Sequence, residues 1–316
     1  NFAVIDKVNQ KLSHYGNLLA DGRPILNLTC EDLVKIILDI SDNCMIIPAH
    51  AWTPHFSLFG SNSGFDSIVE CFMEETGNIY SIETGLSSDP AMNWRLSKLD
   101  SITLISNSDA HSLRNLGREA NVFEVTDSEN LYNEILQIIK TKNRQKFLYT
   151  IEFFPEEGKY HFDGHRSCGV RLHPKESISN SDLCPECGRL MTIGVLHRVE
   201  ELADRPESFL PNDSIPFKSV IPLEEIIADA LQVGKGTATV DREYFNLINK
   251  FGSEFNVLLE VEEEKLLEFC QERISEGIIK MRSGDVEINP GFDGVYGTIK
   301  IKWSLERVLA KKEEQL

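Results

Sequence analysis

The first half of the chain alternates between short apolar runs and amphipathic helical segments, and this alternation constrains the fold more than any other feature. Runs that we predict to be buried strands cover residues 44–47, 79–82 and 102–105. Segments with helical periodicity surround them, over 3–13 and 30–41, from Gly64 onward, and over 90–98 and 128–142. Alternation at this spacing predicts parallel strands joined by helical crossovers, in either a barrel or an open sheet. We therefore predict an α/β fold.

Polar residues predict where several of these helices begin. Thr29 is placed to cap the helix over 30–41, and Thr126 with Glu129 forms a capping-box pattern for the helix over 128–142. Both signals supply acceptors for the unpaired N–H groups of a first helical turn. The helix that opens at Gly64 is expected to turn four apolar side chains toward the core: Ile68, Val69, Phe72 and Met73.

Each predicted strand is followed by side chains of the types that bind metal ions. His50 follows the first strand, Glu83 the second, and Asp109 with His111 the third. In parallel β/α architectures the carboxyl ends of the strands meet at one edge, where chemistry gathers. Carboxylate and imidazole groups there can share a divalent ion. The alternative is a polar cap over each strand end, but repetition over three successive strands favours a metal site.

A second ligand pattern lies within 155–195, a region poor in helix signals and rich in glycine, proline, cysteine and histidine. Its candidate ligands form two pairs, each with two residues between its members: His165 and Cys168, then Cys184 and Cys187. Such pairs are typical of a zinc ribbon, in which tight turns direct four side chains at one tetrahedral ion. Gly188 suits the turn after the second pair, and His161 or His173 can replace His165 as a ligand. Four protein ligands leave no position for water, so we predict structural Zn²⁺; the alternative is four reduced, unliganded side chains.

Composition bounds the class of protein. A chain of 316 residues with 41% hydrophobic content is long enough for two or three domains. It has no apolar run of about 18 residues and no basic, apolar start, so we expect neither a membrane span nor a signal peptide. Seven cysteines, three of them near a histidine with ligand spacing, indicate a reducing, cytoplasmic location. The net charge of −18 argues against a protein that coats nucleic acid non-specifically.

The last third of the chain has mainly helical signals. Pro222 suits the first position of one helix, Asp241 is placed to cap a second that Gly252 closes, and a third is expected over about 262–281. Residues 289–301 form a glycine-rich loop that runs into a strand. The chain contains no internal repeat, P-loop or dinucleotide-binding fingerprint.

Several motifs resemble those of the PHP (polymerase and histidinol phosphatase) superfamily. They are Ile47–Pro54, which holds His50, Glu83–Arg95, and Ser106–Ser112, which holds Asp109 and His111. Further motifs are similar to those of the endonuclease Q family within it: Gly117–Asn121, Asp163–Cys168, Cys184–Cys187, Leu202–Pro206 and Pro290–Tyr296. The resemblance covers nearly the entire chain, and its motifs are long enough to be specific.

The resemblance implies an architecture in three parts. These are a distorted PHP-type β/α barrel over 1–154, a zinc-binding module over 155–200 and a mainly helical region over 201–316. By carry-over, His50, Glu83, Asp109 and His111 fall on metal-ligand positions for a cluster of Zn²⁺, Mg²⁺ or Mn²⁺. The first PHP strands, with their His-x-His and first Glu ligands, would precede Asn1. The barrel and its metal cluster are therefore expected to be N-terminally incomplete in this chain.

The resemblance also implies cleavage of DNA on the 5′ side of a deaminated base (uracil, hypoxanthine, xanthine) or an abasic site. The partners would be damaged DNA, with replication or repair factors as further candidates. Asp109 and His111 are the candidate catalytic residues, and Asp109 is the candidate bridging ligand. Arg95 and Arg118 are candidates for holding phosphate oxygens, with surface salt bridges as the alternative.

Further contacts with a DNA substrate are expected near the motif that holds His50 and in the second half of the chain. Trp52 can stack on a nucleotide, although core packing is the commoner role of a lone tryptophan. Side chains near Arg198 and Arg205, together with the zinc module, are expected to grip the duplex. Rival functions are a PHP phosphoesterase acting on a small phosphorylated metabolite, and a non-catalytic, helicase-associated DNA-binding module.

Overall fold

The chain forms two units, and each is assembled from two separate stretches of sequence. This computed structural model describes residues 1–20, 24–126 and 129–303. Unit 1 comprises Asn1–Thr150 and Ile193–Phe217, and unit 2 comprises Ile151–Thr192 and Lys218–Leu316. The first and last of the crossings between them fall inside two strands, β4 (Phe147–Glu152) and β7 (Phe217–Ser219).

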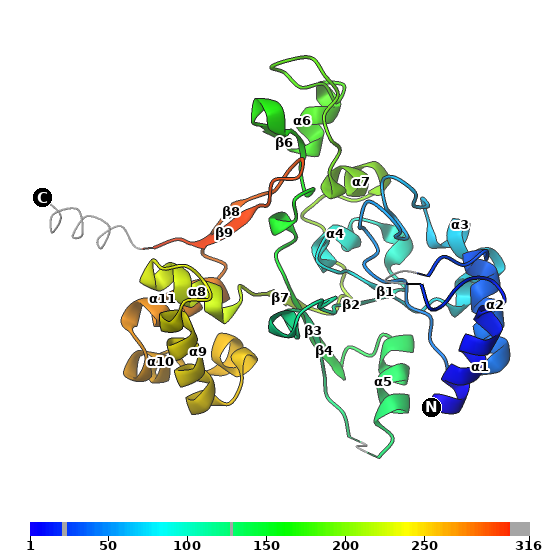
Figure 1. Cartoon of the computed structure of the whole chain (residues 1–316), viewed down its shortest axis with the longest axis horizontal. Coiled ribbons are helices and arrows are strands. Elements are labelled where there is room, and N and C mark those ends of the chain that lie inside the picture. Colours follow the sequence, from blue (N-terminus) through cyan, green and yellow to red (C-terminus); the bar gives the residue numbers. More distant parts are fainter. Residues whose placement is uncertain (21–23, 127–128, 304–316) are drawn as a thin grey trace, which may run out of the picture. The chain divides into compact units, whose positions relative to one another are not determined.

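The centre of unit 1 is a pair of short parallel strands, β1 (Ser81–Glu83) and β2 (Thr103–Ile105), with Glu83 opposite Ile105. The helices of unit 1 are α1 (Phe2–Leu12), α2 (Cys30–Ile40), α3 (Ile68–Phe72), α4 (Pro90–Trp94), α5 (Leu131–Lys140) and α7 (Val195–Leu202) (Figure 1). Short 3₁₀ helices are η1 (Met73–Asn78), η2 (Ser97–Leu99) and η3 (Leu113–Asn115). Strand β3 (Ala120–Phe123) belongs to a three-stranded sheet with the order β3-β4-β7. The predicted α/β class and the parallel pairing are confirmed.

The first predicted strand, over 44–47, is not a strand in the structure, and this prediction is wrong. The chain nevertheless runs beside β1 a few residues later: the Glu83 N–H donates to the Pro48 carbonyl (3.0 Å), and the Ala51 N–H donates to the Glu83 carbonyl (3.0 Å). Proline has no N–H for a ladder, and His50 has a positive φ of 35°, outside the extended region. The strand is therefore replaced by an irregular segment that still lies at the edge of β1.

Of the two predicted helix caps, the one for α2 is confirmed and the one for α5 is wrong. The Thr29 hydroxyl accepts a hydrogen bond from the Asp32 N–H (3.0 Å), which confirms the cap of α2. The capping box at Thr126 is wrong, because α5 begins at Leu131 and Asn130 is its N-cap. Thr126 donates to the carboxylate of Glu134 instead, from its N–H (3.0 Å) and its hydroxyl (2.9 Å). Residues 127 and 128 lie outside the described residues.

Helix α3 is shorter than the apolar spacing suggested. Ser67 caps it, and its Ile68 and Phe72 side chains are buried as predicted. Val69 and Met73 are 61% and 59% exposed, so their assignment to the core is wrong. For Met73 the reason lies in the backbone: α3 ends at Phe72, and Met73 has a φ of 48°, which turns the chain out of the helix. The predicted helix over 90–98 is likewise divided between α4 and η2.

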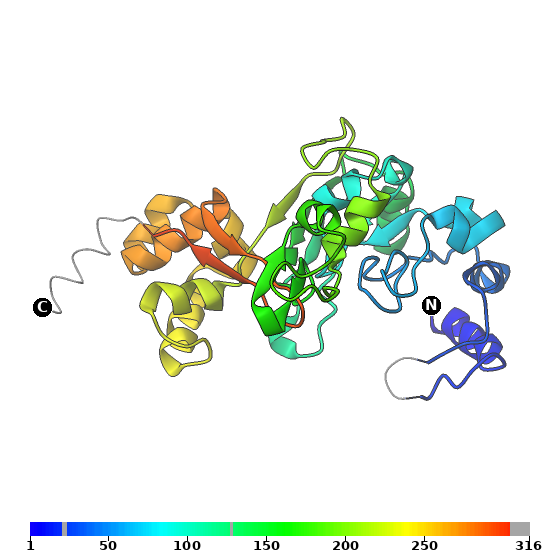
Figure 2. The same cartoon turned by 90° about the horizontal axis from the view of Figure 1, so that it is seen from above.

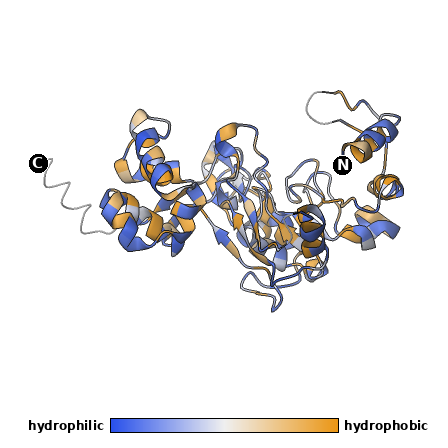
Figure 3. Cartoon of the chain, turned by 90° about the horizontal axis from the view of Figure 1, so that it is seen from below, coloured by the Kyte–Doolittle hydropathy of each residue, from blue (hydrophilic) through white to orange (hydrophobic). Residues whose placement is uncertain are grey.

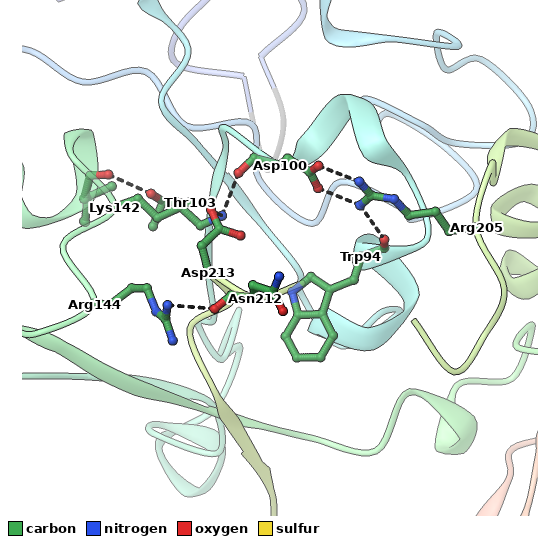
Figure 4. A network of polar contacts seen from close by, with 9 residues as sticks. Trp94, Asp100, Thr103, Lys142, Arg144, Arg205, Asn212 and Asp213 are labelled. Carbon is green, nitrogen blue, oxygen red and sulfur yellow. Dashed lines mark hydrogen bonds and ion pairs between the residues drawn. The ribbon is translucent and has the colours of Figure 1, made fainter. Parts of the chain in front are cut away.

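The second stretch of unit 1 is bound to the first by both apolar and polar contacts. Val195 and Val199 of α7 belong to the same buried cluster as Trp52, Phe59 and Ile82. Figure 4 shows polar contacts between the two stretches of unit 1. Arg205 and Asn212 belong to residues 193–217, and their partners belong to the first stretch: Trp94, Asp100 and Arg144. Residues 193–217 are therefore an integral part of unit 1.

The ion pair between Arg205 and Asp100 is one of these polar contacts and is bidentate. Both terminal nitrogens of Arg205 donate to the Asp100 carboxylate, at 2.6 and 2.5 Å (Figure 4). This hydrogen bonding lowers the pKa of Asp100 below its usual range. Lys142 Nζ donates to the Asp100 carbonyl (2.6 Å), and Arg144 donates to the Asn212 carbonyl (2.8 Å). Bidentate geometry of this kind fixes orientation as well as distance.

Unit 2 contains a small β region and a helical bundle. The small region has an antiparallel hairpin, β5 (Asp163–His165) and β6 (Val170–Leu172), with η4 (Pro155–Glu157), η5 (Arg166–Cys168) and α6 (Pro174–Ser179). The bundle has α8 (Leu223–Leu231), α9 (Ala238–Phe251), the π-helix η6 (Asn256–Glu260), α10 (Glu263–Phe269) and α11 (Glu272–Arg282), gathered together in both views (Figures 1 and 2). Its helices carry hydrophobic and hydrophilic residues side by side (Figure 3), as amphipathic helices do. An antiparallel hairpin, β8 (Val286–Asn289) and β9 (Thr298–Ile301), follows.

Two helix assignments in the bundle need correction. Helix α9 begins at Ala238 with Thr237 as its cap, so Asp241 lies in its first turn and does not cap it. The third predicted helix is two helices, because the chain leaves the helical conformation at Cys270 and Gln271 between α10 and α11. Pro222 before α8 and Gly252 after α9 lie where predicted.

The compact units divide the chain differently from the three predicted segments. Residues up to Thr192 of the predicted zinc-binding segment group with the C-terminal helices, while 193–217 group with unit 1. The functional division into a barrel, a zinc module and a helical region remains a prediction. Within the described part of the chain, no helix combines the length and apolar character needed to cross a bilayer.

Candidate functional site

Glu83 lies at the centre of the strand-end edge of unit 1. One of its carboxylate oxygens accepts from the His50 backbone N–H (3.0 Å), and the other accepts from Nδ2 of Asn107 (3.0 Å). The segment with His50, strand β1 and the loop after β2 therefore lie side by side. This is the adjacency that parallel strand ends predict.

Asn121 of β3 holds the loop that leads to Asp109. Its Oδ1 accepts from the Ser106 N–H (2.9 Å), and its Nδ2 donates to the Ser106 carbonyl (2.7 Å) and to Oδ1 of Asn107 (3.2 Å). Sequence reasoning assigned no role to this residue, although it ends one of the family-like motifs. A side-chain amide can make such a clamp because it is donor and acceptor at once.

Two candidate ligands have an unusual backbone. His50 has a φ of 35° and Asp109 a φ of 44°, in a region that non-glycine residues seldom occupy. Gly85 explains how the first is accommodated: a Cβ there would lie 2.9 Å from both Cα and Cβ of His50. Such conformations persist where surrounding structure imposes them and are often found at functional sites.

The donor atoms at this edge differ in what they contact. Nδ1 of His50 is buried and has no hydrogen-bond partner within the described structure. Asp109 and His111 are exposed, and the His111 ring contacts the Asp109 carbonyl (2.8 Å). A buried imidazole nitrogen without a partner is costly unless something binds it. The donor types and this orphaned nitrogen fit a divalent metal ion, although no three of the four candidates converge as one ligand group in the described structure.

Trp52 is a core residue, and the prediction that it stacks on a nucleotide is wrong. Its side chain is 1% exposed, its ring lies 4.8 Å from that of Phe59, and its Nε1 donates to Oδ1 of Asn93 (2.8 Å). A side chain whose ring and N–H are both engaged in the interior has no free face for a base.

Arg95 is also internal, which contradicts its assignment to phosphate binding. It is 4% exposed and forms an ion pair with Glu200 (2.6 Å). Arg118 differs: it is half-buried, and its Nε donates to the carbonyl of Ser108 (3.2 Å), the residue before Asp109. Arg118 thereby contributes to the shape of the candidate site.

The guanidinium groups of Arg198 and Arg205 are bound within unit 1. Arg198 donates to the Phe59 carbonyl (3.2 Å) and to Asp66 (2.5 Å), and Arg205 is paired with Asp100 as described above. Both groups maintain the fold, so the expectation that they grip a duplex is not supported by their contacts.

The second ligand pattern does converge. One potential ligand atom from each of His165, Cys168, Cys184 and Cys187 lies within 4.8 Å of all the others. Sγ of Cys187 and Nδ1 of His165 are 3.4 Å apart. His165, and neither His161 nor His173, is the histidine of this group. Four soft and borderline donors at such distances make a possible metal-binding site.

Two tight turns bring these ligands together. Gly169 and Gly188 have φ values of 67° and 70°, which glycine adopts without strain, and each follows one ligand pair. Around the second pair, the Cys184 N–H donates to the Arg189 carbonyl (2.7 Å) and the Gly188 N–H to the Cys184 carbonyl (2.8 Å). A hydrogen bond from the Arg189 backbone lowers the pKa of the Cys187 thiol, which favours the thiolate that metals bind.

His161 is buried away from this group, 4% exposed, with its ring stacked on Phe162 at 5.5 Å. Burial, helped by the nearby charge of His173, lowers the pKa of His161 to about 4. His161 is therefore a neutral, buried part of unit 2 at neutral pH.

The chain is similar in sequence to one domain family and to two curated proteins. Residues 222–285 match the model of the MJ0043 C-terminal domain. The chain is 34% identical to the uncharacterized protein MJ0043 of Methanocaldococcus jannaschii over 82% of this chain and 33% of the relative. It is 33% identical to the uncharacterized protein YqxK of Bacillus subtilis over 81% of this chain and 61% of the relative. The chain thus spans about a third and about three fifths of the lengths of these curated relatives.

Two solved structures extend the match to nearly the whole chain. The lesion-specific endonuclease PfuEndoQ of Pyrococcus furiosus is 32% identical, with a TM-score of 0.85 over 98% of this chain and 76% of that one. A complex of endonuclease Q with a 27-mer duplex carrying an abasic lesion at the active site is 32% identical, with a TM-score of 0.81 over 98% of this chain and 77% of that one. The chain belongs to the endonuclease Q family.

Proposed function

We propose that the protein is a metal-dependent DNA-repair endonuclease that cleaves the phosphodiester on the 5′ side of deaminated bases or abasic sites. The observation that carries the proposal is the similarity, over 98% of the chain, to a lesion-specific endonuclease and to an endonuclease Q bound to an abasic duplex. Uracil, hypoxanthine and xanthine are the deaminated bases to test. A damaged pair costs less to open than an intact one, which gives such an enzyme part of its selectivity.

We assign the chemistry to the strand-end edge of a PHP-type barrel to which residues 1–154 contribute. His50, Glu83, Asp109 and His111 would hold divalent metal ions, which when bound activate water and neutralise charge on the leaving oxygen. Within this chain, Glu83 orients the His50 backbone and Asn107, and Arg118 supports the loop before Asp109. The orphaned Nδ1 of His50 supports the assignment.

The His165–Cys187 group would hold a structural Zn²⁺. Three thiolates and one imidazole complete a tetrahedral shell, so the ion would stabilise the module and take no part in hydrolysis. The support is the convergence of four donors from two turns that are far apart in the sequence.

The central test is a nicking assay on end-labelled duplexes with Mg²⁺ or Mn²⁺. Each duplex carries one uracil, one hypoxanthine, one abasic site or no lesion. We expect cleavage 5′ to the lesion and none of the undamaged duplex. Asp109→Ala should lower the nicking rate by about 10³-fold, because a ligand that organises charge stabilisation of several kcal/mol is lost.

Asp39→Ala, which removes an exposed carboxylate of α2, is the matched control and should nick at the wild-type rate. Cleavage that does not depend on a lesion, or full activity of Asp109→Ala with a normal melting curve, would refute the assignment. Turnover of a small phosphomonoester without nicking would favour a PHP phosphoesterase. Lesion binding without any hydrolysis would favour a non-catalytic DNA-binding module.

A further inference from the structure

The glycine-rich loop between β8 and β9 makes a tight two-residue turn. Asp293 and Gly294, at its tip, have φ values of 42° and 84°. Across them, the Phe292 N–H donates to the Val295 carbonyl (3.0 Å), and the Val295 N–H donates to the Phe292 carbonyl (2.8 Å). Positive φ at both central residues is the mark of a type I′ turn, for which Asp-Gly is a preferred pair. The loop therefore has a defined conformation.

The backbone of this loop is fixed to η4 and to the residues that follow it. The Gly291 N–H donates to the Glu156 carbonyl (2.8 Å), and the Gly294 N–H donates to the Lys159 carbonyl (2.9 Å). A Cβ at Gly297 would overlap the Glu156 carbonyl oxygen, so this close approach depends on glycine. The tip of the β8–β9 hairpin thus lies against the small β region of unit 2 (Figure 1).

The carboxylate of Asp293 is used to hold the turn. One oxygen accepts from the Arg166 backbone N–H (2.6 Å), and the other accepts from the Thr192 hydroxyl (2.6 Å). The Arg166 guanidinium and the Tyr160 hydroxyl lie beside the tip: Nη1 and Oη are 3.5 and 3.9 Å from the position that a Cβ on Gly294 would take. The turn therefore has a basic and an aromatic side chain next to it.

A lysine lies over two tyrosine rings on the same surface. Nζ of Lys159 is 5.4 Å from the ring centre of Tyr160 and 5.9 Å from that of Tyr296. A cation over two rings holds both of them near it. Tyr296 nevertheless remains 71% exposed, so most of its ring is open to a ligand. We call Lys159, Tyr160, Arg166 and Tyr296 the tyrosine–lysine surface.

The two cations of this surface are not used by the fold as others are. In unit 1, Arg95, Arg198 and Arg205 are each paired with a carboxylate. Lys159 and Arg166 are exposed, and neither side chain has a carboxylate partner in the described part of the chain. In a chain with a net charge of −18, such a pair of cations is a local exception. Free cations beside exposed rings are the combination with which proteins bind single-stranded nucleic acid.

We propose that the tyrosine–lysine surface binds unpaired nucleotides of a DNA strand, with a base stacked on the Tyr296 ring and phosphates held by Lys159 and Arg166. DNA is the occupant because the inference rests on the proposed function, in which nucleotides at a lesion leave the base stack. A fully paired duplex offers no base face except at its ends. The surface is therefore expected to prefer single-stranded over duplex DNA.

Photocross-linking of the whole protein locates the stacked base directly. The probe is an undamaged single-stranded oligonucleotide that carries 5-iodouracil, which on irradiation joins to an aromatic ring stacked on it. Peptide mapping by mass spectrometry should find the DNA on Tyr296. Cross-links confined to other parts of the chain, or no cross-link at all, would overturn the proposal. This readout uses the wild-type protein and needs no cleavage.

Matched variants measure what each side chain contributes to affinity for the same strand. Tyr296→Ala should raise the Kd by about tenfold, because base stacking on the ring is lost. Tyr296→Phe keeps the ring and should bind as wild type. Tyr132→Ala removes a tyrosine of α5 that is 59% exposed, and it should also bind as wild type.

The charge is tested by the dependence of binding on salt. Lys159→Gln should lower the slope of log K against log salt concentration by about 0.7, because one phosphate contact with a single strand is lost. Lys98→Gln, at an exposed lysine of η2, is the control and should keep the slope.

Unchanged affinity in Tyr296→Ala together with an unchanged slope in Lys159→Gln would refute the surface. Because the strand is undamaged and only binding is measured, this result is independent of the nicking assay. A protein that binds as expected but does not nick would contradict the proposed function and leave the surface in place.

Discussion

The two candidate metal sites of this protein contrast in how their ligands are brought together. In unit 2, four donors from two ligand pairs converge within 4.8 Å, each pair on its own tight turn. In unit 1, the candidates His50, Glu83, Asp109 and His111 come one or two at a time from successive strand ends, and Glu83 links them through backbone and amide contacts. In unit 2, the short sequence spacing within each ligand pair brings the donors together. In unit 1, the order of strands and helices in the fold brings the candidate residues to one edge.

This difference predicts different responses to mutation. Loss of one ligand in unit 2 would remove the ion that we propose stabilises a small module, so the main effect is expected on folding. Loss of a supporting residue in unit 1 shifts backbone that the fold must hold in a strained conformation, so site geometry changes together with stability.

The largest effect is expected from removal of a ligand in unit 2. Cys184→Ala should lose the bound zinc and destabilise unit 2 by about 5 kcal/mol or more, because metal binding contributes folding free energy in such modules. Zinc stoichiometry and thermal melting by circular dichroism measure this. Cys44→Ala, at a half-buried cysteine of unit 1, is the control and should keep its zinc. Unchanged zinc content in Cys184→Ala would mean that the four donors do not form a site.

A smaller but still large effect is expected from Gly85→Ala. The added Cβ would lie 2.9 Å from the His50 backbone, and the residue has a φ of 64°, so we expect a loss of about 3 kcal/mol. Chemical denaturation measures the loss, and a lower nicking rate should accompany it. Gly77→Ala is the matched control, because a Cβ there meets no atom within 4 Å. Equal stability of the two variants would contradict the close approach to His50.

An intermediate effect is expected from the pH dependence of His161, a buried histidine of the unit 2 β region. The folded-state pKa of His161 is about 4, below the ordinary histidine value of 6.5. The unfolded chain therefore binds more protons between these two pH values, and acid lowers stability. Between pH 7 and pH 5 the wild type should lose about 2 kcal/mol more than His161→Leu. Denaturation at both pH values, with zinc present, gives this difference. Parallel curves for the two proteins would show that His161 titrates normally.

The smallest effect is expected at Asn121. Asn121→Ala removes the clamp on Ser106 and Asn107 and should cost about 1 kcal/mol. Asn121→Asp keeps the acceptor for the Ser106 N–H but places a carboxylate oxygen against the Ser106 carbonyl and Oδ1 of Asn107, so it should destabilise the protein more than alanine does. Amide hydrogen exchange at Ser106 reports the clamp directly. If exchange there is the same in all three proteins, the loop is held by other contacts.

Features encoded over a few residues could be predicted from the sequence. The Thr29 cap, the turn at Gly188 and the pairing of Cys184 with Cys187 each depend on neighbours within four positions. The adjacency of the His50 segment, Glu83 and the loop after β2 could be predicted because parallel strands place their carboxyl ends together, a rule that needs only element order.

Features that depend on tertiary packing could not be predicted from the sequence. The sequence leaves Trp52 and Arg95 open between substrate binding and a structural role. In the structure Trp52 is buried against Phe59, and Arg95 is paired with Glu200, more than 100 positions away. The clamp by Asn121 also joins residues whose proximity no local pattern encodes. An apolar run did not suffice to make residues 44–47 a strand, and the chain beside β1 at Pro48 and His50 is irregular, with a positive φ at His50.

Unit 1 is built from residues 1–150 and 193–217, and this affects what happens when a protease cuts the chain between them. A protease that cuts within 151–192 would leave unit 1 as two separate peptides, joined by the burial of Val195 and Val199 and by the bidentate pair of Arg205 with Asp100. After such a cut, unit 1 would consist of two peptides held together by non-covalent contacts alone. Peptides over 1–150 and 193–217 should recognise each other when mixed, whereas a fragment that simply ends at Thr150 would expose the apolar surface that α7 covers.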